Sequence, residues 1–246
     1  MRVVAVYNIK GGVGKTATAV NLAYLAAGAG LRTLVWDLDP QGASSFYFRI
    51  KPRIKGGGGK MLRGKTALDD LVKGTDFDNL DLLPADFSYR HMDLVLGDAK
   101  KPTLRLLKLL RPLSEAYDWV ILDCPPSISL VSENIFRAAD GLVVPMIPTT
   151  LSVRTLTQLV GFLDDHGLDY LPVLPFFSMV DRRKRMHLDV MAHLGSAGPR
   201  PLETAIPYSS EVERMGVHRA PVAHYAPRSP VAAAYQRLWE EVRTAL

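Results

Sequence analysis

The feature that most constrains this chain is a glycine-rich loop near its start, between an apolar run and a segment of helical character. The loop reads Lys10-Gly11-Gly12-Val13-Gly14-Lys15-Thr16. Glycines let successive backbone N–H groups turn inward and surround phosphate oxygens where a helix begins. Lys15 would then reach the β- and γ-phosphates of a nucleotide, and the Thr16 hydroxyl would ligate Mg²⁺. A glycine turn that only joins a strand to a helix is the alternative, and it does not require this combination of residues.

The loop departs from the plain phosphate-loop pattern in one respect. That pattern places a glycine five positions before Gly14, where this chain has Ile9. An additional lysine, Lys10, follows instead. The sequence therefore indicates a variant phosphate loop with two lysines.

Short β-rich runs alternate with longer helical stretches, which is typical of a parallel sheet covered by helices. We expect strands at residues 2–8, 33–37, 80–83, 119–123, 142–146 and 171–177. We expect helices at residues 16–29, 103–113, 131–138, 151–165, 209–215 and 230–245. The 246 residues are 48% hydrophobic and show no internal repeat or break in composition, so we predict a single domain over residues 1–246. The predicted class is an α/β fold of P-loop NTPase type, with a mostly parallel sheet flanked by helices on both faces.

Residues 49–65 differ in composition from the rest of the chain. They contain a run of four glycines and no acidic residue. We expect this segment to be a flexible basic loop on the surface. Its seven basic residues are Arg49, Lys51, Arg53, Lys55, Lys60, Arg63 and Lys65.

Acidic residues follow two of the predicted strands. Asp37 and Asp39 lie at the end of the strand at 33–37, and Asp123 ends the strand at 119–123. Ligands of open α/β sheets bind beyond the carboxyl ends of the strands, and residues two apart on a strand share a face. These carboxylates would therefore lie near the phosphates, whereas each one alone could be a helix cap or a turn residue. The single cysteine, Cys124, excludes an internal disulfide framework and favours a reducing, cytoplasmic setting.

Three blocks in this order resemble the ParA/MinD family of deviant Walker-type ATPases. They are the phosphate loop, Asp37-Leu38-Asp39-Pro40-Gln41-Gly42 and Val120-Ile121-Leu122-Asp123-Cys124-Pro125-Pro126. A looser block from Ile206-Pro207 to Tyr235 also fits, and residues 49–101 match least.

The resemblance implies a Mg²⁺-dependent ATPase that is slow and is stimulated by a partner. Lys10 would be the signature lysine that reaches the phosphates of the partner subunit in a nucleotide-sandwich homodimer. Asp39 would activate the attacking water, while Asp37 and Asp123 would bind Mg²⁺ through water together with Thr16. The implied catalytic residues are Lys10, Lys15 and Asp39. The implied nucleotide contacts are Lys10, Gly11, Gly12, Val13, Gly14, Lys15, Thr16, Ala17 and Pro207, with Ala17 standing where many members have threonine.

Basic residues outside the loop are candidates for DNA binding. The net charge is +5, and Arg182, Arg183, Lys184 and Arg185 form its densest cluster. Arg214 and Arg219 follow, but Glu211 lies near the place of a DNA-contacting arginine in the family and would repel phosphates. The alternative for the cluster is a solvated charged turn. Binding through such residues is independent of DNA sequence and falls steeply with salt.

The leading interpretation is an ATP-driven switch that positions or segregates DNA or a protein cargo. Its partners would be non-specific DNA and a ParB-like activator, and it would be cytoplasmic and associated with the nucleoid. A metabolic enzyme of the same superfamily, such as an amide synthase or dethiobiotin synthetase, is the alternative. A membrane-associated, MinD-like regulator is disfavoured, because the apolar stripe of the last helix is expected to pack on the sheet. That stripe consists of Tyr235, Leu238, Trp239, Val242 and Leu246.

Overall fold

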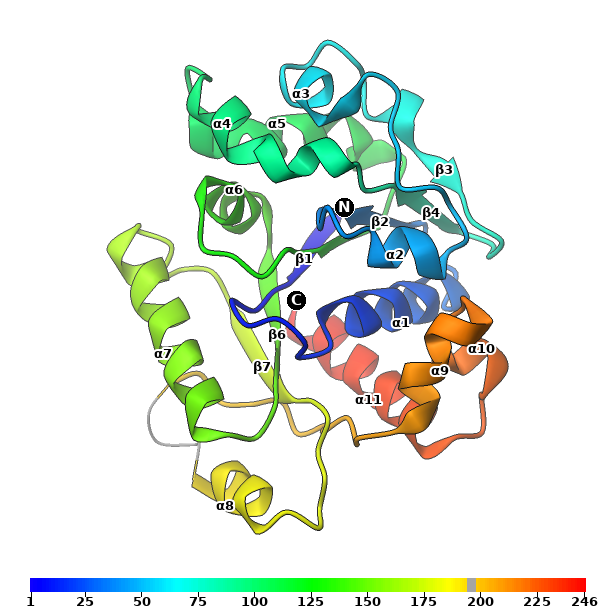
Figure 1. The fold of residues 1–246 in the computed structure, drawn as a ribbon, viewed down its shortest axis with the longest axis vertical. Coiled ribbons are helices and arrows are strands. Elements are labelled where there is room, and N and C mark those ends of the chain that lie inside the picture. The colour runs from blue at the N-terminus through cyan, green and yellow to red at the C-terminus, as the bar shows by residue number, and fades with distance from the viewer. Residues whose placement is uncertain (194–197) are drawn as a thin grey trace.

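A seven-stranded sheet forms the centre of the computed structural model, which describes residues 1–193 and 198–246 (Figure 1). The strand order is β3-β4-β2-β5-β1-β6-β7, and every neighbouring pair is parallel except β3 with β4. The strands are β1 (Arg2–Val6), β2 (Thr33–Asp37), β3 (Lys73–Gly74), β4 (Leu80–Leu83), β5 (Trp119–Asp123), β6 (Gly141–Met146) and β7 (Val173–Phe177). The predicted fold class is therefore confirmed.

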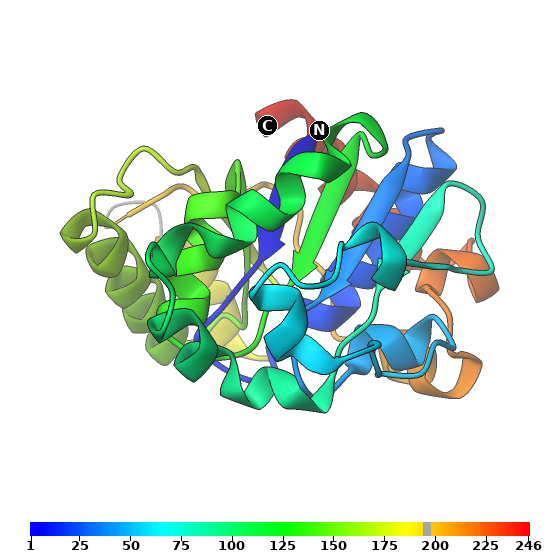
Figure 2. The same cartoon turned by 90° about the horizontal axis from the view of Figure 1, so that it is seen from above.

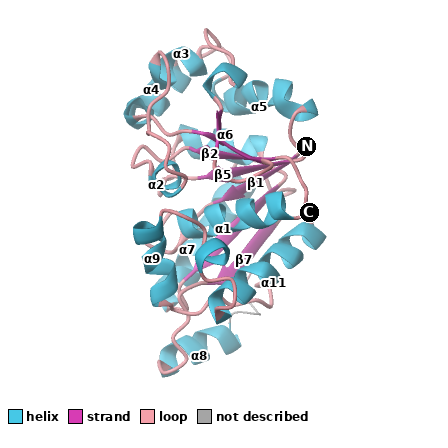
Figure 3. Cartoon of the chain, turned by 90° about the vertical axis from the view of Figure 1, so that its right-hand side faces the viewer, coloured by secondary structure: helices cyan, strands magenta, loops and turns pink. Residues whose placement is uncertain are grey.

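The central strands are apolar over most of their length because helices cover both faces of the sheet (Figures 2 and 3). β2, β5 and β6 are buried at every residue. All six predicted strands are present, with small changes at the ends of three of them. The short antiparallel β3 was not predicted, since two exposed residues carry no alternating pattern.

One face of the sheet is covered by four helices that share an apolar core with it. They are α1 (Lys15–Gly28), α9 (Ser210–His218), α10 (Val222–Tyr225) and α11 (Pro230–Ala245). The predicted apolar stripe of the last helix packs inward: Trp239 meets Trp119 of β5 with ring centroids 4.8 Å apart. None of the helices in the described part of the chain is long and apolar enough to cross a membrane.

The opposite face is covered by a second group of helices and by their own apolar core. They are α3 (Gly57–Leu62), α4 (Met92–Gly97), α5 (Arg105–Leu110), α6 (Leu130–Ala138) and α7 (Thr150–Asp165). The short α2 (Ala43–Tyr47) follows β2, and α8 (Arg185–His193) lies beyond β7. Short 3₁₀ turns complete the described elements at Asp69–Leu71, Phe87–His91, Pro102–Leu104 and Arg111–Glu115.

Two sequence expectations need correction. The single helix predicted at 103–113 is divided into a 3₁₀ turn, α5 and a second 3₁₀ turn that contains Pro112. The segment 49–65 is not a flexible loop throughout, because residues 57–62 form α3 and bury Met61 and Leu62. Tertiary packing overrides the low helix propensity of glycine here, since a Cβ on Gly58 would approach the Tyr89 ring to 2.6 Å.

Candidate functional site

The glycine-rich loop connects β1 to α1 and opens at the carboxyl end of the sheet. Gly12 and Gly14 have φ angles of 72° and 94°, values that favour glycine. Gly14 is the N-cap of α1 and offers no side chain to cap it, so the first N–H groups of the helix are free to bind an anion. This geometry is that of a phosphate cradle.

The two lysines of the loop lie in different surroundings. Lys15 is 7% exposed and its Nζ donates a 3.0 Å hydrogen bond to the carbonyl oxygen of Lys10. Burial lowers the pKa of Lys15, and the Asp123 carboxylate opposes that shift. Lys10 is half-buried and forms no ion pair with any residue of the described chain. Its backbone N–H donates to Asn8 Oδ1 at 2.9 Å, which fixes the start of the loop.

Two of the three candidate carboxylates are fully buried next to the loop. Asp123 accepts hydrogen bonds from Thr16 Oγ1 at 3.3 Å and from Ser44 Oγ at 2.8 Å. Asp37 Oδ2 accepts from the backbone N–H and the hydroxyl of Ser45, at 2.8 and 2.7 Å. Burial raises the pKa of both carboxyls, and the charge of Asp123 raises that of Asp37 further. Burial also raises the pKa of Cys124, in keeping with a small buried residue rather than a nucleophile.

Asp39 lies beyond the strand rather than on it. β2 ends at Asp37, and Asp39 is half-exposed in the turn that follows, where its Oδ1 accepts a 2.9 Å hydrogen bond from the Gln41 N–H. The expectation that Asp37 and Asp39 share a strand face is therefore wrong. The charge of Asp39 nevertheless contributes to the raised pKa of Asp37 and Asp123, so all three carboxylates surround one region.

The donor set at this place fits a magnesium ion. Asp37 Oδ1 is buried and has no hydrogen-bond partner among the described residues, and the buried charge of Asp123 lies close to it. Mg²⁺ is commonly held by one or two carboxylates and completes its shell with water and phosphate oxygens. In the described ranges no cluster of three or more His, Cys, Asp and Glu side chains is arranged as a metal cage. A hydroxyl and two carboxylates are the donors available here.

Two further predicted nucleotide contacts, Ala17 and Pro207, lie on different segments of the chain. Ala17 is buried in the first turn of α1. Pro207 forms a parallel bridge with Val180, just beyond the end of β7. Ser178, the residue after β7, faces the loop so closely that a Cβ on Gly14 would lie 3.0 Å from its Oγ. The segment after β7 is thus held against the phosphate loop.

The candidate DNA-binding residues do not form one surface of free charges. Arg183 pairs with Asp181 at 2.9 Å and Arg185 approaches Asp189 at 3.9 Å, while both remain more than four-fifths exposed. Lys184 and Arg182 are exposed and form no ion pair with the described residues.

The basic residues on α9 and at its C-terminal end make contacts within the chain. Arg214 pairs with Glu211 at 3.3 Å, so the acid that would repel phosphates is partly neutralised by its neighbour. Arg219 donates from Nε to the Phe46 carbonyl at 3.0 Å and stacks over the Phe46 ring.

Sequence reasoning missed several polar residues of the site. Ser44 and Ser45 on α2 hold the two buried aspartates, and Asn8 anchors the loop with a 2.8 Å bond from Nδ2 to the Pro145 carbonyl. A pair of serines just after Asp37-x-Asp39-Pro40-Gln41-Gly42 was the available signal.

Comparisons with known proteins agree with this geometry. A family model described as an AAA domain matches residues 1–167. The chain is 36% identical to the chromosome-partitioning ATPase Soj of Thermus thermophilus, over 98% of this chain and 95% of that protein. It is 30% identical to the sporulation initiation inhibitor protein Soj of Bacillus subtilis, over 98% of both chains. Cobyrinic acid a,c-diamide synthase from Mycobacterium smegmatis, solved with ADP and magnesium, is 27% identical with a TM-score of 0.83 and covers 98% of this chain and 93% of its own.

The loop at the end of β1 and the buried aspartate at the end of the adjacent β5 define the fold as that of a P-loop NTPase. Together with the full-length similarity to the Soj proteins, they show that the chain belongs to the ParA family of ATPases. The resemblance drawn from the sequence is confirmed.

Proposed function

We propose that this protein is an ATP-dependent dimerising switch that hydrolyses ATP to ADP and phosphate and positions DNA or a protein cargo. The observation that carries this proposal is the difference between the two loop lysines. Lys15 is buried within its own loop, whereas Lys10 is half-exposed beside it without an acidic partner in the described structure. A free cation at the mouth of a phosphate site is available to a nucleotide held by a second copy.

The nucleotide would bind with its phosphates on the loop N–H groups of Gly11 to Thr16. Thr16, Asp37 and Asp123 would hold Mg²⁺, the two aspartates through water, which removes the repulsion between their buried charges. When bound, Mg²⁺ would neutralise charge that develops on the phosphates. Asp39, in the half-exposed turn at the side of the site, would orient the attacking water. Pro207 would pack against adenine, and Ala17 would contribute a backbone N–H.

Closure of two copies around ATP would link the nucleotide state to partner binding. Lys10 of each copy would contact phosphates held by the other, so that loss of the γ-phosphate weakens the dimer. The ATP-bound dimer would bind non-specific DNA through the cluster at Arg182 to Arg185, and a ParB-like protein would stimulate the slow hydrolysis. The similarity to the Soj proteins supports this assignment. The protein would then be cytoplasmic and associated with the nucleoid.

Co-sedimentation with plain DNA and with anionic liposomes, each with ATP and with ADP, tests the proposal. We expect retention on DNA with ATP, loss of retention with ADP, and no retention on liposomes in either state. A chain retained on liposomes would instead be a membrane-associated regulator.

A metabolic enzyme is the second candidate, supported by the 27% identity to the diamide synthase. Such an enzyme would transfer a phosphoryl group from ATP to a carboxylate substrate before amide formation. ATP turnover that depends on an added carboxylic acid, without retention on DNA, would favour this function over the switch.

A further inference from the structure

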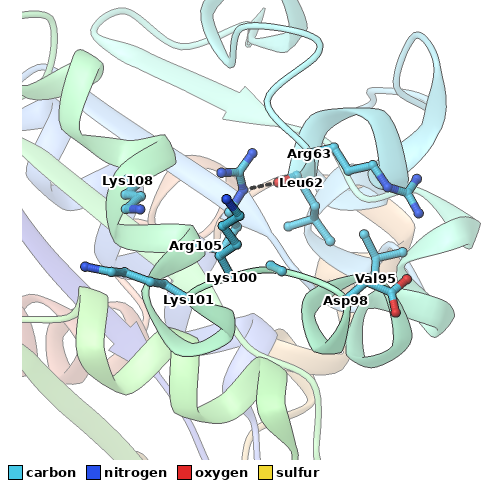
Figure 4. A pocket seen from close by; sticks show the side chains of 9 residues that line it. Leu62, Arg63, Val95, Asp98, Lys100, Lys101, Arg105 and Lys108 are labelled. Atoms are coloured by element: carbon cyan, nitrogen blue, oxygen red, sulfur yellow. Dashed lines mark hydrogen bonds between the residues drawn. The ribbon is translucent and has the colours of Figure 1, made fainter.

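A basic pocket lies between α3, α4 and α5, formed by residues that the nucleotide site does not use (Figure 4). Its volume is about 520 Å³, within the range of roughly 300 to 1,000 Å³ that is typical of small-molecule sites. The residues on the α5 side are Lys100, Lys101, Arg105 and Lys108, and those opposite are Leu62, Arg63, Val95 and Asp98 (Figure 4). We call this cavity the α3–α5 pocket.

The charges of the α3–α5 pocket are strongly unbalanced. Five cations line it and Asp98 is its single acid. Within the described residues none of the five cations forms an ion pair, although seven other arginines of the chain do. Like charges gathered in a concave place repel one another and destabilise the fold, so an anionic ligand is the natural partner for such a site.

Arg105 is the fixed element of the pocket. It is half-buried, and its Nε donates a hydrogen bond to the Leu62 carbonyl oxygen at the end of α3 (Figure 4). That bond orients the guanidinium while its two terminal nitrogens remain without a hydrogen-bond acceptor among the described residues. A guanidinium held in one orientation is suited to bind two oxygens of a phosphate at once.

The surroundings of Arg105 strengthen its field. Leu62, Val95 and Ala99 provide an apolar wall, and walls of low polarity focus the field of a charged cleft. Lys100, Lys101 and Lys108 are exposed on flexible stems and can turn toward a bound anion. Several cations spread around one fixed guanidinium suit a ligand with more than one phosphate group.

We propose that the α3–α5 pocket binds an oligophosphate, a chain of two or more linked phosphate groups, at a site separate from the phosphate loop. Inorganic polyphosphate and the phosphate tail of a second nucleotide both have this chemistry. The concave shape, lined by side chains from three helices and from the loop between α4 and α5, accommodates a short flexible anion better than the convex backbone of a DNA duplex. The proposal is independent of the ATPase assignment, because no residue of the pocket belongs to the nucleotide site.

Titration calorimetry with inorganic tripolyphosphate tests the site in a Lys15→Ala background, in which binding to the phosphate loop is strongly weakened. We expect one tripolyphosphate per chain, bound more tightly than orthophosphate. The triple variant Lys100→Gln, Lys101→Gln, Lys108→Gln should weaken binding about tenfold or more. A matched triple variant, Lys55→Gln, Lys60→Gln, Lys73→Gln, removes the same charge from exposed lysines outside the pocket and should change the affinity less than about twofold.

These variants replace exposed residues, so their melting curves should match that of the parent; Arg105→Gln, which removes the bond to α3, serves only as a second variant. Absence of tripolyphosphate binding to the Lys15→Ala protein would overturn the proposal, as would equal losses in the two triple variants. An unchanged tripolyphosphate affinity with weakened duplex DNA binding would overturn it in favour of a nucleic-acid surface. A parallel titration with ATP distinguishes the two ligands. If ATP binds more tightly than tripolyphosphate, the pocket holds the phosphate tail of a nucleotide. If the two bind equally, the pocket recognises only the phosphate chain.

Discussion

Lys10 and Lys15 show how one loop gives the same residue type two environments. Lys15 points into its own loop and bonds to the Lys10 carbonyl, in the place where phosphate oxygens would lie. Burial of the ammonium costs free energy unless an acceptor or an anion is near it. In the described structure only the Lys15 ammonium has such an acceptor, so Lys15 is the residue whose removal should affect a bound nucleotide most directly.

We expect Lys15→Ala to reduce ATP affinity by about 100-fold or more, because charged hydrogen bonds contribute about 1.5–3 kcal/mol each. Fluorescent-nucleotide titration measures this decrease. Lys73→Ala, at an exposed lysine on β3, is the matched control and should bind nucleotide as the parent does. Affinity unchanged from the parent in Lys15→Ala, also when Lys100, Lys101 and Lys108 of the α3–α5 pocket are replaced by Gln, would contradict the phosphate-loop assignment.

A different pair, Arg32 and Asp118, connects the segments that lead into β2 and β5. The Arg32 guanidinium donates to both Asp118 oxygens, at 3.1 and 2.8 Å, and its backbone N–H donates at 2.9 Å. These bonds hold the pKa of Asp118 at about 2, below its ordinary value. A lowered pKa in the folded state means that the pair stabilises the fold above the unfolded pKa of about 3.9 and loses this effect as pH falls toward 2.

We therefore expect Asp118→Asn to lower the free energy of unfolding slightly at pH 7. The difference from the parent should shrink between about pH 4 and about pH 2. Urea unfolding at several pH values measures this trend. A difference that stays constant over the acid range would show that the carboxylate charge is not the cause.

The residues of the site could be predicted from the sequence only where a pattern of neighbouring residues marks them. The loop, Asp37 and Asp123 were proposed from the sequence because glycines, lysines and strand ends mark them, and the structure places them close together. Ser44 and Ser178 were missed because serine is common and the groups that they contact lie far along the chain, 79 residues in the case of Ser44 and Asp123. Ser45 lies near Asp37 in the sequence, but no sequence pattern marks a serine as the hydrogen-bond partner of a buried carboxylate. The end of β2 at Asp37 was predicted, but the turn that holds Asp39 was not, because its hydrogen bond to the Gln41 N–H has no sequence signal of its own.

Among the elements, α3 differs most from its sequence pattern. Four successive glycines indicate a flexible segment, yet Gly57–Leu62 is helical and packs against the turn at Phe87–His91. The close approach of Gly58 to Tyr89 explains why glycine is needed there, which local propensity does not reveal. Strands buried on both faces were predicted well, because their continuous apolar runs have few alternative interpretations.

The segment that leads into α8 carries the prediction about DNA. We expect Arg182→Glu with Lys184→Glu to weaken DNA binding. The slope of log affinity against log salt concentration should become less steep by roughly 0.9 for each phosphate that the variant no longer neutralises. Filter binding of a non-specific duplex over a range of salt concentrations measures both. Lys73→Glu with Arg237→Glu makes the same change in net charge at exposed residues elsewhere and should have a smaller effect. If both variants bind alike, the DNA surface lies elsewhere.

At the scale of the whole molecule, the proposed function depends on a second copy of the chain. Lys10 and Asp39 are both half-exposed, whereas the two carboxylates proposed to hold Mg²⁺, Asp37 and Asp123, are fully buried. In the proposed dimer, the phosphate loop and the buried carboxylates would bind the nucleotide, whereas Lys10 would act in closure and Asp39 in hydrolysis. Dimerisation and turnover should therefore be separable by mutation.

We expect Asp39→Ala to bind ATP, to lose most turnover and to accumulate as a dimer. Light scattering after size-exclusion chromatography with ATP gives the mass, and phosphate release gives the rate. Adding Lys10→Ala to Asp39→Ala should return the protein to the monomer, since the bond across the interface is removed. Unchanged turnover in Asp39→Ala would exclude Asp39 from the hydrolytic step.

The order of the strands also has a consequence for synthesis on the ribosome. β1 is the first strand to emerge, but its neighbours are β5 (Trp119–Asp123) and β6 (Gly141–Met146). The nascent chain must therefore extend past residue 119 before β1 gains its first partner. Such distant pairings slow folding and leave apolar strands exposed in the meantime. The phosphate loop and Asp123 can therefore meet only after β5 has taken its place between β2 and β1.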